Sequence, residues 1–110
     1  MKRWDIYWAN FPYEDDPTKQ KRRPVVIAKD GTVYVLTLKV TTHEARTHDP
    51  YDYPLRYWQE SNLPSASVVR VSKLAKLPPS AFGEFIGQIH PYDAIMIQNR
   101  MSEFLHNRKE

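Results

Sequence analysis

The stretch VVIAKDGTVYVLTLKVTT, residues 25–42, determines much of the expected fold. Its first five residues are nearly all apolar, and Asp30 and Gly31 then form a pair typical of a turn between antiparallel strands. Apolar and polar side chains alternate over residues 32–42, which is the period of a strand with one buried face. The expected buried face holds Tyr34, Leu36, Leu38 and Val40, and the polar face holds Thr37, Lys39 and Thr41.

More short strands are expected on both sides of this hairpin. Residues 4–11 are rich in aromatic and β-branched side chains, and residues 67–77 alternate in polarity until a proline pair ends them. The long polar segments 12–24 and 43–54 are expected to be loops.

The other segments favour turns and one helix. Residues 55–61 suit a short helix or turn, and residues 80–89 suit one helical turn followed by a short strand. Pro91 is well placed in the first turn of a C-terminal helix, whose inner face would hold Ile95, Met101, Phe104 and Leu105. Several short strands and one closing helix predict a mostly β fold, a small curled antiparallel sheet or barrel.

The composition indicates a single domain spanning residues 1–110. Sixteen Lys and Arg against thirteen Asp and Glu give a net charge of +3, which is weak evidence for a nucleic-acid partner. The chain has no Cys, which excludes disulfides and cysteine-based metal sites. The N-terminal MKRWDIYW lacks the apolar region of a signal peptide, and no run of transmembrane length follows. We therefore expect a soluble cytoplasmic protein that does not associate with membranes.

A cluster of positive charge precedes the first strand of the hairpin, in TKQKRRPVV at residues 18–26. Like charges at this density repel one another, so the cluster predicts an anionic partner. Arg23 differs from its neighbours because Pro24 and the strand behind it fix its backbone position. The other cations suit solvated or phosphate-steering roles: Lys19, Lys21 and Arg22.

Three polar elements are expected to meet if the sheet curls: the cationic segment, the strand end at Thr41 and Thr42, and Arg70 on a later strand. The loop after the strand end adds His43, Arg46 and His48. Cations, hydroxyls and imidazoles suit cleavage of RNA, because the 2′-hydroxyl must lose a proton and the phosphorane charge must be neutralised. Arginine also binds phosphate through two parallel hydrogen bonds. From the sequence alone, Thr41 also suits a plain strand end, and Arg70 also suits an ion pair with an acid across the sheet.

No metal or cofactor is expected. His43 and His48, with Asp49 or Asp52, have a spacing that matches no common metal motif. The aromatic residues are mostly core candidates, although a few on loops suit base stacking.

Five pieces of the chain, in order, resemble the MazF/PemK family of toxins from bacterial toxin–antitoxin modules. RWDIYWANF is similar to the family's opening strand, and KRRPVVIAK to its junction of Arg-Pro with an apolar strand. LKVTTHEART resembles its strand that ends in a hydroxyl pair, and SVVRVSKLAKL the later strand that carries an arginine. IGQIHPYDAIMIQNRMSEFL resembles its closing strand and C-terminal helix.

The resemblance implies a small half-open antiparallel barrel of the PemK/CcdB-like, Src-homology-3 type with a C-terminal helix, working as a homodimer. It also implies a sequence-specific, metal-independent endoribonuclease that cuts single-stranded RNA, leaving 2′,3′-cyclic phosphate and 5′-hydroxyl ends. A cognate antitoxin would inhibit it by laying a flexible acidic tail over the RNA site. We expect the dimer to bury apolar residues from 80–89 and 51–58.

By resemblance, the catalytic residues are Arg23, Thr41 and Arg70, while Asp5 matches an acidic residue of the first strand. The expected RNA-binding residues are Lys19, Lys21, Arg22, Thr42, His43, Arg46 and His48. Two departures leave the general acid and base open. Ser72 replaces an aspartate that some members carry, and the histidine that some members place before Arg-Pro is absent.

Two other functions remain open at this point. The fold class includes toxins that poison DNA gyrase through a tail ending in Trp-Gly-Ile, whereas this sequence ends in HNRKE. A non-catalytic small barrel that binds RNA, DNA or a peptide would need no chemistry at Arg23 or Thr41. An assay for RNA cleavage separates these alternatives.

Overall fold

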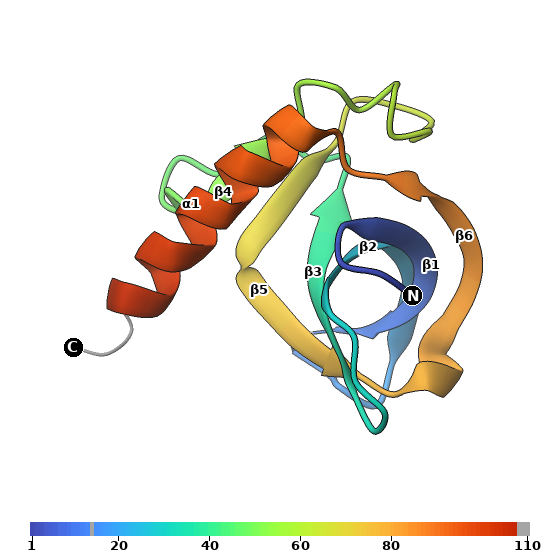
Figure 1. Cartoon of the computed structure of the whole chain (residues 1–110). Helices are drawn as coiled ribbons and strands as arrows, with labels where there is room; N and C mark the ends of the chain where they lie inside the picture. Colours follow the sequence, from blue (N-terminus) through green and yellow to red (C-terminus); the bar gives the residue numbers. More distant parts are fainter. Residues whose placement is uncertain (14, 108–110) are drawn as a thin grey trace.

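A computed structural model, which describes residues 1–13 and 15–107, shows one antiparallel sheet followed by a helix (Figure 1). Residues 108–110, in the tail HNRKE, and residue 14, in the expected loop 12–24, lie outside the described part. The elements are β1 (Asp5–Pro12), β2 (Gln20–Lys29), β3 (Val35–Thr41), β4 (Asp52–Pro54), β5 (Val68–Leu77), the 3-10 turn η1 (Pro79–Ala81), β6 (Phe82–Gln88) and α1 (Pro91–Asn107).

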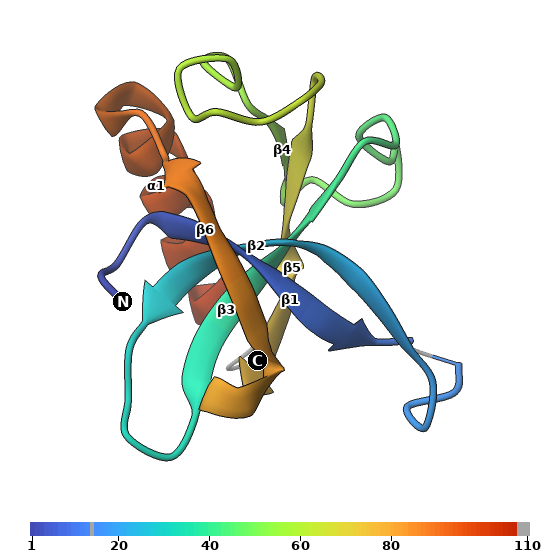
Figure 2. The same cartoon turned by 90° about the vertical axis from the view of Figure 1, so that its right-hand side faces the viewer.

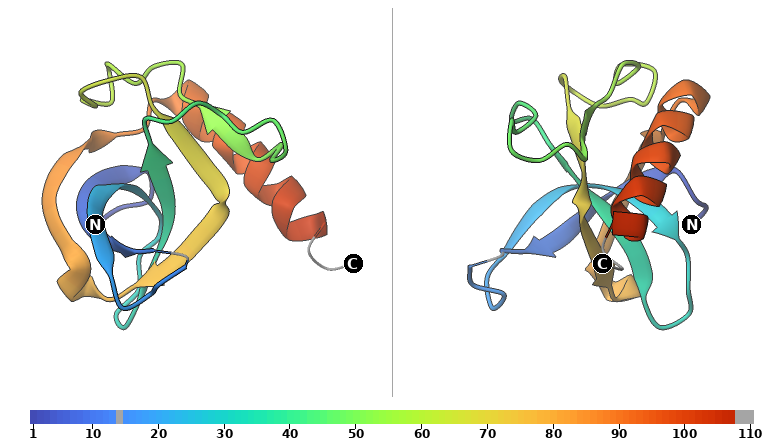
Figure 3. Two further views of the ribbon diagram at one scale, coloured as in Figure 1. Left: turned by 180° about the vertical axis from the view of Figure 1, so that it is seen from behind. Right: turned by 90° about the vertical axis from the view of Figure 1, so that its left-hand side faces the viewer.

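The six strands lie in the order β4-β5-β3-β2-β1-β6, and neighbouring strands are antiparallel. The sheet curls until β6 stands across from β5, but these two strands are not neighbours in it (Figure 1). Helix α1 runs along the outer side of β5, beside β4 (Figure 3). The predicted fold class, a half-open antiparallel barrel with a C-terminal helix, is confirmed.

Strand β2 is longer than its sequence predicts, because it begins at Gln20 within the expected loop. It pairs with β1 as far as Gln20, which faces Pro12, but its pairing with β3 begins only where Val25 faces Lys39. On its other edge β3 pairs with β5 along its whole length, from Val35 to Thr41. Residues 20–24 therefore form a strand edge without a β3 partner, a position that tolerates proline. We call this segment the free edge of β2.

Two apolar clusters cover opposite faces of the central strands. The larger contains Ile6, Val26, Leu38 and the helix residue Ile97, and the smaller is built around Phe11, Val25 and Leu77.

Because both faces of β3 are covered, its predicted division into an apolar and a polar face is wrong in part. Thr37 is fully buried and donates a hydrogen bond from Oγ1 to the Ala75 carbonyl at 3.0 Å. Tyr34 precedes the strand and is exposed.

The inner face of α1 also differs from the expected one. Met101 is buried and Phe104 packs against the core, as expected, but Ile95 and Leu105 are 64% and 41% exposed. Asp93 and Ile97 are buried instead. The predicted face did not include Ile97 or the acidic Asp93. The buried carboxylate of Asp93 accepts hydrogen bonds from the Tyr53 hydroxyl and from two backbone amides, those of Arg56 and Tyr57.

The segments between strands give the remaining differences. The expected loop 43–54 contains the short strand β4, whereas residues 55–61 form turns, one of the two forms expected for them. The loop after β1 and the loop after β3 project from the same side of the molecule (Figure 2). Within the described residues, no helix is long and apolar enough to cross a membrane.

Candidate functional site

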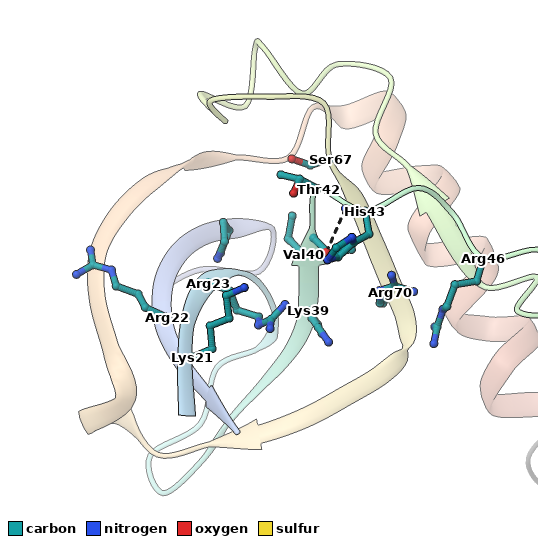
Figure 4. A pocket seen from close by; sticks show the side chains of 12 residues that line it. Lys21, Arg22, Arg23, Lys39, Val40, Thr42, His43, Arg46, Ser67 and Arg70 are labelled. Carbon is teal, nitrogen blue, oxygen red and sulfur yellow. Dashed lines mark hydrogen bonds between the residues drawn. The ribbon is translucent and has the colours of Figure 1, made fainter. Parts of the chain in front are cut away.

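A cavity of about 370 Å³ opens where β2 and β3 separate. The free edge of β2 forms one side, the end of β3 and its following loop form another, and β5 closes the back (Figure 4). We call it the cationic cavity, and its lining residues are Lys21, Arg22, Arg23, Pro24, Lys39, Val40, Thr41, Thr42, His43, Arg46, Ser67 and Arg70. All predicted site residues line it except Lys19 and His48.

The cavity concentrates charge of one sign. Lysine and arginine side chains approach it from β2, β3, β5 and the loop after β3, and none of the described residues that line it is an Asp or Glu. Several cations held together on different elements repel one another unless an anion lies between them. The cavity therefore fits an anionic ligand, and its hydroxyl groups add neutral hydrogen-bond donors.

Arg23 is the cation at the centre of this arrangement. Its Nε is buried and has no hydrogen-bond partner among the described residues. Burial lowers the pKa of Arg23, and the nearby positive charge of Arg70 lowers it further, against an opposing effect of Tyr13. A partly buried guanidinium without a counter-charge is costly. A bound phosphate would supply both the missing charge and the missing acceptor.

Arg70 and Arg46 have carboxylate partners. Strand pairing places Asp52 of β4 opposite Arg70 of β5, and Arg70 Nη1 donates to Asp52 Oδ2 at 2.8 Å. Arg46 donates to the same carboxylate from its backbone N, its Nε and its Nη2, each at 2.9 Å. Burial favours the neutral acid, but the hydrogen bonds and charges of both arginines outweigh it and lower the pKa of Asp52. Asp52 is therefore a structural counter-ion and a weak base.

Asp49 extends this network to the position where a departure from the family occurs. It accepts hydrogen bonds from Arg46 Nη2 at 2.8 Å and from the Ser72 hydroxyl. Ser72 carries no carboxylate of its own but contacts the carboxylate of Asp49. Asp49 and Asp52, considered above as metal ligands, bind cationic side chains instead. Within the described residues no three His, Asp or Glu side chains gather as a metal site would require.

Thr41 ends β3 and shapes the entrance of the cavity. It is buried, and its Oγ1 accepts a hydrogen bond from the backbone N of His43 at 3.3 Å (Figure 4). This contact turns the chain so that His43 and Thr42 lie exposed at the rim. His43 thereby contributes an imidazole to the cavity.

Two predicted residues lie elsewhere. His48 is exposed in the loop before β4, and Lys19 is exposed with its Nζ 4.0 Å from Asp16. Asp5, matched to the family's acidic residue, is buried at the other end of β1, where it accepts hydrogen bonds from Lys2 N and Gln88 Nε2. Asp5 therefore stabilises the start of the sheet.

The sequence prediction missed three residues of the site. Lys39 and Ser67 line the cavity, and Asp52 holds Arg70 from behind. Lys39 was recognisable from its place on the strand that ends at Thr41. Ser67 and Asp52 gave no such signal, because their positions depend on the pairing of β4 with β5.

Comparison with solved structures finds proteins of the same fold. A mycobacterial endoribonuclease in complex with its cognate antitoxin has a similar structure, with a TM-score of 0.75 at 16% identity over 96% of this chain and 95% of that chain. The Mycobacterium tuberculosis toxin MazF-mt6 is similar with a TM-score of 0.72 at 20% identity, over 93% of this chain and 96% of that chain. A second mycobacterial endoribonuclease is similar with a TM-score of 0.73 at 15% identity, over 96% of this chain and 91% of that chain. These likenesses show the fold.

Sequence comparison identifies the family. No curated protein matches the sequence. Residues 2–105 match the family described as PemK-like, MazF-like toxins of type II toxin–antitoxin systems, which is nearly the whole chain. The chain therefore belongs to this toxin family.

Proposed function

We propose that this toxin is a sequence-specific endoribonuclease that cleaves single-stranded RNA without a metal ion. One observation carries the proposal: the partly buried guanidinium of Arg23 has no acceptor for its Nε within the described chain and shares a cavity with the ion-paired Arg70. The match to a toxin family and the likeness to structures named endoribonucleases support it.

The chemistry suits an intramolecular displacement. The 2′-oxygen attacks phosphorus as its proton leaves, the bond from phosphorus to the 5′-oxygen breaks, and the 5′-oxygen takes up a proton. The products are a 2′,3′-cyclic phosphate and a 5′-hydroxyl. Arg23 would stabilise the added negative charge through paired hydrogen bonds. Arg70, held by Asp52, would stabilise the same charge from the other side of the cavity.

The remaining roles follow from exposure and contacts. His43 lies at the rim and is the one imidazole among the described lining residues, so it is our candidate for moving a proton. Thr41 would keep His43 and the turn at residues 41–43 in place through its hydrogen bond. Lys21 and Lys39 would bind neighbouring phosphates.

The decisive experiment incubates the purified protein with a randomised RNA pool in EDTA and sequences the new 5′ ends. We expect cleavage at a defined sequence, cyclic-phosphate products, and no cleavage of RNA with a deoxyribose at the cut site. A strict requirement for magnesium contradicts the metal-independent mechanism. RNA that is bound but left intact by an otherwise folded protein would instead indicate a non-catalytic binding module.

The toxin family implies a neutralising partner, and one similar structure contains a cognate antitoxin. We propose that the antitoxin of this chain presents an extended acidic segment to the cationic cavity and competes with RNA there. We also propose a cytoplasmic homodimer. Of the stretches expected at its interface, Phe85 is 54% exposed, while Ile86 and Tyr53 belong to the core. Light scattering with and without an acidic peptide, beside an RNA competition assay, tests both proposals, and a monomer that binds both ligands at once contradicts them.

A further inference from the structure

A second, smaller hollow of about 120 Å³ lies beside the cationic cavity, between β1, the free edge of β2 and the start of β6. Arg22 lines both spaces. Its side chain leaves β2 away from Arg23 and Lys39 (Figure 4), as strand alternation requires. Arg22 therefore joins the two spaces.

The hollow has a flat, layered floor. The guanidinium carbon of Arg22 lies 5.1 Å from the centroid of the Trp8 ring, so the cation rests on the indole face. Trp8 is half-buried against the main core, which fixes this ring, and Arg22 is exposed on its other side. An arginine plane supported in this way is a platform on which an unpaired base stacks.

Polar groups stand at the rim of the platform. Asn10 faces Arg22 across the β1–β2 pair, and Asn10 and Ser80 are exposed and line the hollow. An amide and a hydroxyl supply donors and acceptors that match the edges of a base. A simple phosphate site would need additional cations instead.

Gly83 leaves the space open. It lies in β6 where the register with β1 shifts between Tyr7 and Ala9, and its φ is not positive. The backbone therefore does not require glycine here. A Cβ atom at this position would lie 3.7 Å from Trp8 Cβ and 3.9 Å from Arg22 Nη2, both ordinary contacts. A larger side chain is compatible with the fold but fills the hollow.

We propose that this hollow binds one unstacked base of the RNA, next to the nucleotide whose phosphate occupies the cationic cavity, and sets part of the cleavage sequence. The inference rests on the proposed endoribonuclease function. Arg22 would stack on the base, Asn10 and Ser80 would contact its edge, and the absent side chain of Gly83 would make room for it.

The test compares Gly83→Val with Glu84→Val, a matched change at the exposed neighbouring residue outside the hollow. Sequencing the new 5′ ends from a randomised RNA pool gives the base preference of the enzyme at each position around the cut. We expect Gly83→Val to weaken the preference at one flanking position, roughly 5- to 150-fold, while the other positions keep theirs. Asn10→Ala should alter the same position, and Glu84→Val should alter none. Unchanged preferences in Gly83→Val would overturn the proposal.

A binding measurement separates this proposal from the proposed function. A 2′-O-methyl oligonucleotide pool, which cannot be cleaved, is titrated while tryptophan fluorescence is recorded for the wild type and Trp8→Phe. Quenching that depends on Trp8 supports the base site even if the protein cleaves no RNA. Cleavage without Trp8-dependent quenching leaves the proposed function standing and contradicts the base site. Quenching by an acidic peptide alone would assign the hollow to a protein partner and overturn the proposal.

Discussion

The two walls of the cationic cavity carry the same kind of side chain in opposite electrostatic settings. On the β2 wall, Arg23 has a buried Nε with no partner in the described chain. On the opposite wall, Arg70 of β5 and Arg46 of the loop after β3 share the fully buried carboxylate of Asp52, and we call these two elements together the β5 wall. The β2 wall therefore leaves a cation unpaired, whereas the cations of the β5 wall are neutralised within the protein. This difference distinguishes the arginine that we propose to bind RNA phosphate from two arginines that are held by ion pairs.

This comparison predicts that stability and activity respond separately to the two walls. Removal of Asp52 leaves the buried Arg70 without a counter-ion and weakens the fold. A cation removed from the β2 wall relieves an unpaired charge and leaves the fold intact. The number of arginines in a site is therefore a poor guide to its affinity for phosphate.

The largest effect is expected at Asp52. Asp52→Ala should lower the free energy of unfolding by about 3–5 kcal/mol, because Arg70 and Arg46 lose their shared partner. Asp49→Ala is the matched control. The Asp49 carboxylate binds Arg46 at a more exposed position, so its removal should lower the free energy of unfolding by clearly less. Urea unfolding of both variants measures the difference. Equal stabilities would show that the ion pairs on the β5 wall do not hold it together.

The same carboxylate predicts a dependence on pH. The folded-state pKa of Asp52 lies below its ordinary value of 3.8, so the stabilisation is complete above that value and is lost as the pH falls through the folded pKa. Asp52→Asn should flatten this acid limb of the stability curve. Parallel acid limbs in wild type and Asp52→Asn would assign the acid sensitivity to other carboxylates.

The next effect concerns Arg23. Arg23→Ala should lower the cleavage rate at least 10²- to 10³-fold, roughly the cost of removing one preorganised donor from a developing oxyanion. The free energy of unfolding should stay within about 0.5 kcal/mol of wild type or rise, since an unpaired, partly buried charge is removed. Arg23→Lys should recover little activity, because lysine cannot donate two parallel hydrogen bonds. Single-turnover cleavage and urea unfolding test this, and near-normal cutting by Arg23→Ala would remove the central claim.

A smaller effect is expected at Thr41, which joins the two walls at the end of β3. Thr41→Ala removes the acceptor for His43 N and should slow cleavage about tenfold, while RNA affinity stays close to wild type. Thr41→Ser keeps the hydroxyl and should restore most of the rate. Cleavage rates and filter binding measured side by side test the assignment. A Thr41→Ala protein that cuts normally but binds poorly would reverse it.

The sequence predicted the elements whose signals are local. The hairpin of residues 25–42, the strand ended by the proline pair and the C-terminal helix each carry periodicity or turn residues. The Arg23, Thr41 and Arg70 positions could be proposed for one cavity because each lies on or beside such a strand.

The missed features depend on pairing between distant residues. The three residues of β4 have too short a pattern to mark a strand, yet their pairing with β5 sets Asp52 against Arg70. Likewise, the acidic Asp93 suggests a solvent-facing position on α1, but the Tyr53 hydroxyl and two loop amides satisfy its carboxylate inside the protein. Hydrophobic periodicity cannot show a buried polar residue whose partners lie far away in the sequence.

The smallest predicted effect concerns the outer cations of the β2 wall and tests where that wall ends. Lys21 lines the cavity on the free edge of β2, whereas Lys19 lies outside it, with its side chain 75% exposed and near Asp16. Each phosphate contact with single-stranded nucleic acid contributes about 0.7 to the slope of log affinity against log salt. Lys21→Ala should therefore reduce this slope by about 0.7 and weaken binding similarly for all sequences. Lys19→Ala should leave the slope unchanged. Equal reductions would extend the RNA path into the loop before β2, and no reduction in either would confine phosphate binding to Arg23 and the residues deeper in the cavity.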